Sequence, residues 1–259
     1  MPLLFPRQTL SGGNLVAATI QNLRVSMTGP SSVAIRAGSS IGLSTGRAVV
    51  TLSSDLTADP TVSGPGGLDQ GTEAASTWYY IYLIYDYQAQ SAAALLSANS
   101  SAPVVPPPFT DARLVGAVYN DASSNFVAFE QMNARVSTLP QVILANMSIP
   151  PAGAPATAAL NPGLPVPVTS YYSLKVLIED VAPDSSDDVG VRLSASANGI
   201  GTVDVMTEIG GLGSAVGPHV KRLAGYVELP NIDGNVYFQA NTADNDTLSL
   251  EVVGFQLML

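Results

Sequence analysis

The stretch TWYYIYLIYD, residues 77–86, is the part of the sequence that decides the fold class. Aromatic and β-branched residues fill it almost without interruption, which favours a strand over a helix. Such continuous hydrophobicity predicts that both faces of the strand are covered. An exposed aromatic strand would be an aggregation or interaction site, so we expect a neighbouring subunit to supply the second cover. The candidate subunit-contact residues are Trp78, Tyr79, Tyr80, Tyr82 and Tyr85.

The same aromatic side chains have an alternative interpretation. Trp78, Tyr79 and Tyr80 are able to stack on sugar rings, because their side chains are amphipathic. The flanking Ile81 and Leu83 are typical core residues, so a place in the core or in a subunit interface is preferred.

The composition around this strand predicts an all-β chain. Charged residues make up 12% of the 259 residues and hydrophobic ones 46%, which is too apolar for a disordered chain. The 23 glycines and 19 prolines interrupt the sequence too often for long helices. The short alternating runs between turn-forming clusters are typical of β-strands.

Charge and cysteine content exclude several classes of function. The net charge is −10 with only ten Lys and Arg residues, so no basic patch for nucleic acid is expected. The absence of cysteine excludes disulfides, Cys-bound zinc and thiol catalysis. Residues 1–13 lack the pattern of a signal peptide, and no apolar run is long enough to span a bilayer, so neither secretion by that route nor membrane insertion is expected.

Residues 1–135 are predicted to form an N-terminal β-sandwich or barrel-like domain. Its first strands are expected within residues 15–27, 31–38 and 46–54, separated by turns at 28–32 and 38–46. Residues 112–131 read as two strands joined by the turn NDASSN in the manner of a hairpin.

Residues 136–259 are predicted to form a C-terminal jelly-roll-like β-sandwich. Six strands are expected, within residues 171–180, 189–198, 202–210, 219–229, 235–242 and 247–259. The Pro/Ala/Gly-rich residues 148–167 are expected to be a long loop. The domain boundary is placed at residues 136–140, and a boundary within 148–167 is the alternative.

Two parts of residues 60–131 resemble a segment that recurs in tail fibre, head fibre and related virion surface proteins of tailed bacteriophages. In that family a Gly-Leu-Asp-x-Gly loop precedes a Trp-Tyr-Tyr strand, and an Arg-x-x-Gly-Ala-Val strand follows. The matching positions are Gly67, Leu68, Asp69, Gly71, Trp78, Tyr79, Tyr80, Arg113, Gly116, Ala117 and Val118. The chain departs from the family's Pro-x-Gly-Tyr-Thr element, because VVPPPFTDAR has Phe109 and no glycine there.

The resemblance implies a non-enzymatic structural protein on the capsid or tail surface of a virion. It also implies a homotrimer that contacts other virion proteins, such as the major capsid or tail proteins. The chain has no repetitive shaft sequence, so a capsid decoration or cement protein, or a short head spike, is favoured. The alternative is a tail fibre or receptor-binding protein whose C-terminal domain binds host surface polysaccharide through its loops.

Two short glycine motifs suggest other chemistry. GLSTG, residues 42–46, matches the Gly-x-Ser-x-Gly nucleophile elbow, but no helical pattern follows Ser44 and the only histidine is His219. GGLGSAVG, residues 210–217, resembles a phosphate loop but precedes a strand-like segment. A turn and a loop between strands are the preferred interpretations.

Two acidic segments are candidates for binding a hard cation such as calcium. They are APDSSDD, residues 182–188, and NTADNDT, residues 241–247, and neither has the spacing of a calcium loop. We therefore expect solvated turns, and no metal or cofactor is predicted. A carboxylate pair for glycoside hydrolysis is set by distance in space, so the sequence assigns none.

Overall fold

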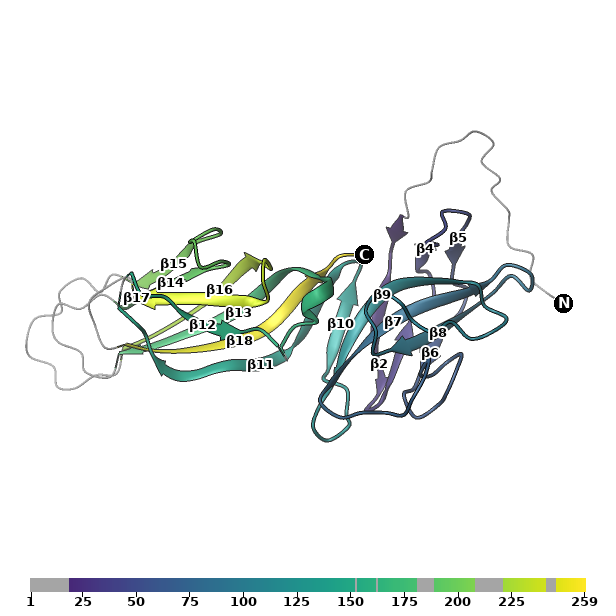
Figure 1. Cartoon of the computed structure of the whole chain (residues 1–259), viewed down its shortest axis with the longest axis horizontal. Helices are drawn as coiled ribbons and strands as arrows, with labels where there is room; N and C mark the ends of the chain where they lie inside the picture. Colours follow the sequence, from purple (N-terminus) through teal and green to yellow (C-terminus); the bar gives the residue numbers. More distant parts are fainter. Residues whose placement is uncertain (1–18, 152, 162, 181–188, 208–220, 241–245) are drawn as a thin grey trace, which may run out of the picture.

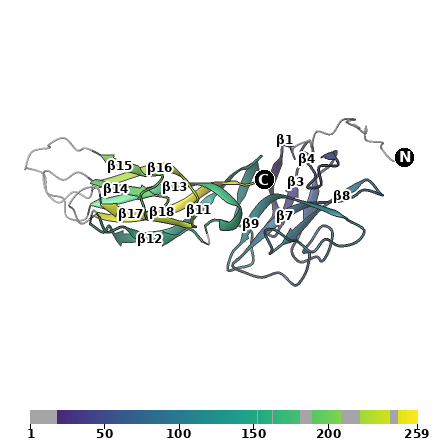
Figure 2. The ribbon, with the colours of Figure 1, turned by 45° about the horizontal axis from the view of Figure 1, so that its top comes forward.

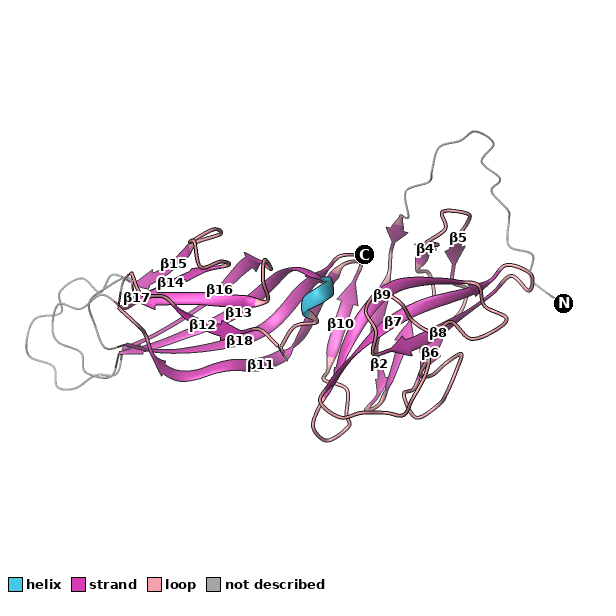
Figure 3. Ribbon diagram, viewed as in Figure 1, coloured by secondary structure: helices cyan, strands magenta, loops and turns pink. Residues whose placement is uncertain are grey.

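The computed structural model describes residues 19–151, 153–161, 163–180, 189–207, 221–240 and 246–259. Within these ranges the regular structure is almost entirely β-strand, and the one helical turn is the 3-10 turn η1 (Val166–Val168), cyan in Figure 3. The predicted all-β class is confirmed.

Two lobes lie next to each other along the long axis of the molecule (Figure 1). The N-terminal lobe, on the right, holds residues 19–134. Its strands are β1 (Ile20–Gln21), β2 (Arg24–Gly29), β3 (Ser32–Ile35), β4 (Ser40–Gly42), β5 (Val49–Thr51), β6 (Leu56–Ala58), β7 (Thr77–Asp86), β8 (Ser91–Ser97), β9 (Asp111–Asn120) and β10 (Phe129–Met132). The aromatic strand β7 is central in an antiparallel sheet of order β8-β7-β9, and a smaller sheet has the order β1-β4-β5.

The C-terminal lobe is built from two sheets. Its strands are β11 (Arg135–Ser148), β12 (Ala156–Ala159), β13 (Thr169–Asp180), β14 (Val189–Ser194), β15 (Val203–Thr207), β16 (Lys221–Pro230), β17 (Asn235–Ala240) and β18 (Asp246–Leu257). One sheet contains β16-β13-β18-β11 and the other has the order β12-β17-β14-β15. Buried side chains alternate with more exposed ones along β13 and β17, so each sheet turns one face toward a core.

A single sheet continues through both lobes. Its order is β16-β13-β18-β11-β10-β2-β3-β6, so β11 lies between β10 of the first lobe and β18 of the second. Val136 of β11 is opposite Gln131 of β10 on one side and opposite Phe255 of β18 on the other. The view in Figure 2 shows the same junction after a 45° turn. The lobes are therefore joined by backbone hydrogen bonds as well as by the chain itself.

The predicted domain boundary falls on this junction. Residues 136–140 belong to β11, and the alternative region, 148–167, contains β12. The division into two domains stays a prediction, but the described chain crosses from lobe to lobe through a strand instead of a Pro-rich linker.

All six strands predicted for the second half are confirmed as β13 to β18. Five strands were not predicted. β4 lies in an expected turn, β6 and β8 lie in stretches for which no strand was expected, β11 lies in the expected boundary region and β12 in the expected long loop. β11 has register shifts against β18 between Ser137 and Met147, which disturb the alternation that marks a strand in the sequence.

The predicted hairpin turn NDASSN is present, because Asn120 and Phe126 form an antiparallel bridge and the Asp121 N–H donates to the Asn125 carbonyl oxygen at 2.8 Å. The prediction that β9 and β10 continue from it as a paired hairpin is wrong. β9 and β10 belong to different sheets and are linked by one bridge, Asn120 with Phe126. The physical reason is that Gln131 of β10 turns its buried side chain toward β9, where its amide nitrogen donates to the Val115 carbonyl oxygen at 2.6 Å. β10 therefore packs across β9 face to face and pairs along its edges with β2 and β11.

Candidate functional site

Both faces of the aromatic strand β7 are covered, as predicted, and the cover comes from the same chain. The exposed fractions of Tyr79, Tyr80 and Tyr82 are only 2%, 6% and 3%. The Tyr79 ring packs against Phe126, and the Tyr82 hydroxyl donates to the carbonyl oxygen of Asn99 at 2.9 Å. No second subunit is needed to bury these three tyrosines, and their role in a subunit contact stays a prediction.

Burial sets the protonation of these phenols. It raises the pKa of Tyr80 and, much further, that of Tyr82, to which the neighbouring Tyr80 and Asp69 also contribute. Both side chains are therefore neutral hydrogen-bonding groups at any physiological pH. Their position inside the lobe makes them part of the core and not a surface for stacking sugars.

The two half-buried members of the predicted set lie near opposite ends of β7. The Trp78 ring contacts Tyr119 of β9, with ring centroids 5.3 Å apart, and Phe255 of β18, with centroids 5.7 Å apart at an interplanar angle of 85°. Trp78 therefore packs in the junction between the lobes. Tyr85 packs edge to face on Tyr87, with centroids 5.1 Å apart.

The Gly-Leu-Asp-x-Gly loop covers the free edge of β8. Leu68 forms parallel bridges with Leu96 and with Ser63, and it is 2% exposed. Gly67 is required because a Cβ there would lie 2.0 Å from the Val62 carbonyl oxygen, and Gly71 has a positive φ of 78°. The loop thus protects an edge strand that would otherwise offer unpaired backbone groups.

Asp69 fastens the next segment to this loop. Its Oδ2 atom accepts hydrogen bonds from the Ser97 hydroxyl at 2.7 Å and from the Val104 backbone N–H at 2.8 Å. The Pro-containing segment 98–105 is held against the sheet in this way, with the help of the Tyr82 bond to Asn99.

The Arg-x-x-Gly-Ala-Val strand is β9, and its glycine has a packing role. The register against β7 shifts between Ile81 and Tyr82, which makes Val115 the extra residue of a β-bulge. A Cβ on Gly116 would lie 2.8 Å from Gln131 Oε1 and 3.1 Å from Ile81 Cδ1. Gly116 therefore leaves the space in which the β10 side chain packs across β9.

The arginine of the same motif lines a polar cleft of about 190 Å³. The cleft is bordered by Ser44, Tyr82, Ser100, Ser101, Ala112, Arg113, Leu114, Met258 and Leu259. Arg113 is half-buried, and its Nε atom is buried with no hydrogen-bond partner among the described residues. Arg113 is a motif position whose residue type is not explained by packing or by the turn geometry of the lobe.

GLSTG forms the turn between β4 and β5, so the serine does not stand between a strand and a helix. The Ser44 hydroxyl donates to the Ala112 carbonyl oxygen. Its neighbour Thr45 donates to Asp111 Oδ2 at 2.7 Å, and the Tyr87 hydroxyl donates to the same oxygen at 2.8 Å. The turn is thereby fixed beside the cleft, which gives these hydroxyls a positioning role.

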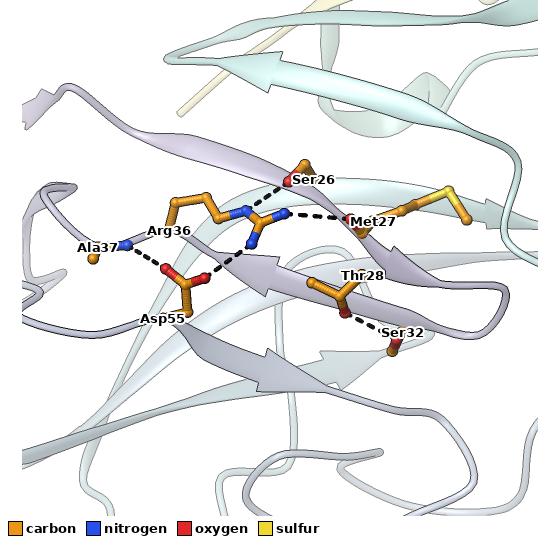
Figure 4. Close-up of polar contacts among 7 residues, drawn as sticks. All are labelled: Ser26, Met27, Thr28, Ser32, Arg36, Ala37 and Asp55. Carbon is orange, nitrogen blue, oxygen red and sulfur yellow. Dashed lines mark hydrogen bonds and ion pairs between the residues drawn. The ribbon is translucent and has the colours of Figure 1, made fainter.

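Sequence reasoning did not find the polar cluster around Arg36 (Figure 4). Its guanidinium donates to Ser26 Oγ at 2.7 Å, to Asp55 Oδ2 at 2.9 Å and to the Met27 carbonyl oxygen at 3.4 Å. The Ala37 backbone N–H donates to Asp55, and together with Arg36 it lowers the pKa of the Asp55 carboxyl. This cluster links β2 and the end of β3 to the segment before β6 by hydrogen bonds. The sequence AIRAG did not indicate it.

The remaining sequence candidates lie largely outside the described residues. They are His219, the glycine loop 210–217, the acidic segment 182–188 and the acidic segment 241–247. Of the last segment, only Asp246 and Thr247 are among the described residues. The part of the chain that the structure describes contains no group of three or more acidic or histidine side chains placed to hold a metal ion. It also contains no helix long and apolar enough to cross a membrane.

Comparisons with family models and with curated proteins do not assign this chain to a family. No protein-family model matches the chain, and no curated protein matches it either.

Proposed function

We propose that this protein is a structural component of a tailed-phage virion, a trimeric capsid decoration or cement protein or a short head spike. The observation that carries the proposal is the β-sheet shared by the two lobes, because it makes one extended and stiff body from two β units. A protein that reinforces or projects from a particle surface needs such stiffness between its attachment part and its outer part.

The strand order of the C-terminal lobe supports the same class. Strands β11, β13, β16 and β18 fall in one sheet and β12, β14, β15 and β17 in the other, so the chain passes repeatedly between the sheets. This is the connectivity of a jelly roll, an architecture common in viral capsid proteins. We infer a jelly-roll sandwich from this order and from the buried faces of both sheets.

The outer face of the larger sheet is the surface that we assign to contacts with other proteins. Tyr226, Lys175, Glu251 and Val142 follow one another across β16, β13, β18 and β11 in a single row. Tyr226 is 75% exposed and Val142 59%, while Lys175 and Glu251 neutralise each other in an ion pair of 2.7 Å. An exposed tyrosine and an apolar residue beside paired charges have the composition of a protein interface.

The first test is the mass of the purified chain by light scattering, together with its binding to empty capsids and to isolated tails. The proposal expects a trimer that binds capsids, and Tyr226→Arg is expected to weaken assembly or capsid binding. The matched control is Ile232→Arg, which changes a residue of 51% exposure in the turn after β16.

Three results would contradict the proposal in different ways. A monomer that binds neither capsids nor tails would remove the virion role. Binding to tails and to host polysaccharide, without binding to capsids, would replace it with the receptor-binding alternative. Equal effects of Tyr226→Arg and Ile232→Arg would remove the outer face as the contact surface.

A further inference from the structure

Arg113 differs from the arginines that stabilise this fold. Arg36 and Arg192 donate to the carboxylates of Asp55 and Asp204, at 2.9 and 2.8 Å. Arg113 forms no ion pair with the described residues, and its Nε–H is buried without an acceptor. A buried donor without a partner costs free energy, roughly 1–3 kcal/mol. The buried Nε–H is out of reach of a molecule in the cleft, so a bound anion would contact the terminal Nη groups of this half-buried guanidinium, which form no ion pair with the described residues.

The nearest acidic side chain on the same strand is already engaged. Asp111 lies two residues before Arg113, on the same face of β9. Its Oδ2 atom accepts from Thr45 and Tyr87, and the side chain is 4% exposed. These two hydroxyls hold the carboxylate in place beside the cleft, and no bond joins it to Arg113. The guanidinium is therefore left to an acceptor from outside the described chain.

The lining around Arg113 adds groups that recognise hydroxylated molecules. Ser44, Ser100 and Ser101 border the cleft. The Ser44 and Ser101 hydroxyls donate to the Ala112 carbonyl oxygen and to Asn99 Oδ1, so each is able to accept a hydrogen bond from a ligand hydroxyl. The apolar residues of the lining are Ala112, Leu114, Met258 and Leu259. A guanidinium beside hydroxyls matches a ligand that carries both a carboxylate and several hydroxyl groups.

Size and charge narrow the class of ligand. The cleft, at about 190 Å³, lies below the ~300–1,000 Å³ typical of sites for drug-sized ligands, so it has room for one small unit. The chain carries a net charge of −10, which repels a dianion such as phosphate more strongly than a monoanion. A single carboxylate is the anion that one guanidinium neutralises completely.

We propose that the Arg113 cleft binds the carboxylate of an acidic monosaccharide unit, such as a uronic acid, with the serine hydroxyls on its ring hydroxyls. Most residues around this site belong to the N-terminal lobe, and Met258 and Leu259 from the end of the C-terminal lobe lie beside them. The proposal goes beyond the structural role proposed above. It does not depend on that role, since the cleft is formed within one chain.

The test is a titration of the full-length ¹⁵N-labelled protein with four probes: glucuronate, glucose, acetate and inorganic phosphate. The direct readout is the NMR signal of the Arg113 Nε–H group in the unaltered protein, so the result does not require a variant to fold. We expect glucuronate to shift this signal, glucose to leave it unchanged, and acetate and phosphate to bind about tenfold more weakly or less.

Variants then locate the site. Arg113→Gln is expected to weaken glucuronate binding by about tenfold or more, since it removes the charge but keeps a polar side chain. Ser101→Tyr fills the cleft from an exposed loop position and is expected to abolish binding with little effect on folding. The matched control is Arg135→Gln, which removes an exposed arginine paired with Glu228 on the other lobe and is expected to leave affinity unchanged.

Three results overturn the proposal. The first is an Arg113 signal that none of the probes shifts. The second is phosphate or acetate binding as tightly as glucuronate, which would make the cleft a general anion site and not a site for a sugar acid. The third is glucuronate binding that both Arg113→Gln and Ser101→Tyr leave unchanged, which would place the ligand elsewhere.

Discussion

The indole ring of Trp78 meets the phenyl ring of Phe255 edge to face, with the ring centroids 5.7 Å apart. Trp78 belongs to β7 in the N-terminal lobe, and Phe255 belongs to β18, the last strand of the C-terminal lobe. Edge-to-face contact is a favourable arrangement of aromatic rings, worth about 0.5–1.5 kcal/mol beyond the area that the rings bury. The junction between the lobes is therefore stabilised by side-chain packing as well as by the shared sheet.

Trp78→Ala is expected to destabilise the whole chain by about 2 kcal/mol, less than the ~3–5 kcal/mol for a fully buried tryptophan, because Trp78 is only half-buried. Urea unfolding followed by circular dichroism measures the loss. Ile232→Ala is the control, since that side chain is 51% exposed in a turn outside the proposed contact surface and its removal is expected to change stability by about 0.5 kcal/mol or less. Equal losses in the two variants would contradict the role of Trp78 in the junction.

Gly116→Ala is expected to destabilise the N-terminal lobe by about 1–3 kcal/mol through overpacking. The new methyl group would lie 2.8 Å from Gln131 Oε1 and 3.1 Å from Ile81 Cδ1. Gln131 has little freedom to move away, because its amide nitrogen donates to two carbonyl oxygens. Gly225→Ala is the matched strand control, where the nearest atom would be 3.4 Å away, an ordinary contact. Thermal unfolding of both variants distinguishes them, and a neutral Gly116→Ala would contradict this account of the bulge.

Gly67, in the loop that covers β8, and Gly64, just before that loop, are expected to respond differently to alanine. Gly67→Ala places a Cβ 2.0 Å from the Val62 carbonyl oxygen, so the backbone must move and the cost is expected to exceed ~3 kcal/mol. Gly64 has a positive φ of 81° but open space around it, so alanine there is expected to cost only about 1–2 kcal/mol. Limited proteolysis within residues 59–71 reports the opening of the loop. The reverse order of the two variants would show that backbone conformation outweighs close packing here.

The Arg36 cluster is expected to lose stability in acid. The folded pKa of Asp55 lies below its ordinary value of 3.8, first because of the Ala37 N–H and then because of Arg36. The contribution of Asp55 is therefore fully present above the unfolded pKa, near 3.8, and is lost as the pH falls through the lower folded pKa. At pH 7 the urea midpoint of Asp55→Asn is expected to lie below that of the unaltered chain. At pH 3 the midpoints of the two proteins are expected to converge. A constant difference at both pH values would contradict the titration of Asp55.

The sequence predicted those strands in which the local pattern of apolar residues matches the burial of the side chains in the structure. The residues of β7 are apolar on both faces, and both faces are covered. In the C-terminal lobe, β13 and β17 alternate between buried and more exposed side chains, and all six predicted strands are present. In β13 and β17 the pleat of the strand and the position of the core impose the same two-residue period.

The features that were not predicted depend on contacts distant in the sequence. β11 has the polar residues Ser137 and Thr138 and the imino acid Pro140 where it passes between the lobes, so its pattern does not resemble a strand. The cover of the tyrosines was assigned to another subunit, whereas residues far along the same chain supply it. The Arg113 cleft brings Ser44, Ser101 and Arg113 together from three separate segments. Only the fold places such residues side by side.

The position of β11 limits how this protein can be divided or recombined. Residues 135–137 provide hydrogen-bonding partners to β10 on one side and to β18 on the other. A cut just before this strand would leave β10 with an open edge, and a cut just after it would leave the C-terminal sheet without most of its edge strand. An exchange of lobes between related chains therefore has to carry the β10–β11 hairpin as a unit, so the natural module for transplantation begins at Phe129 and not at the residue where the second lobe begins.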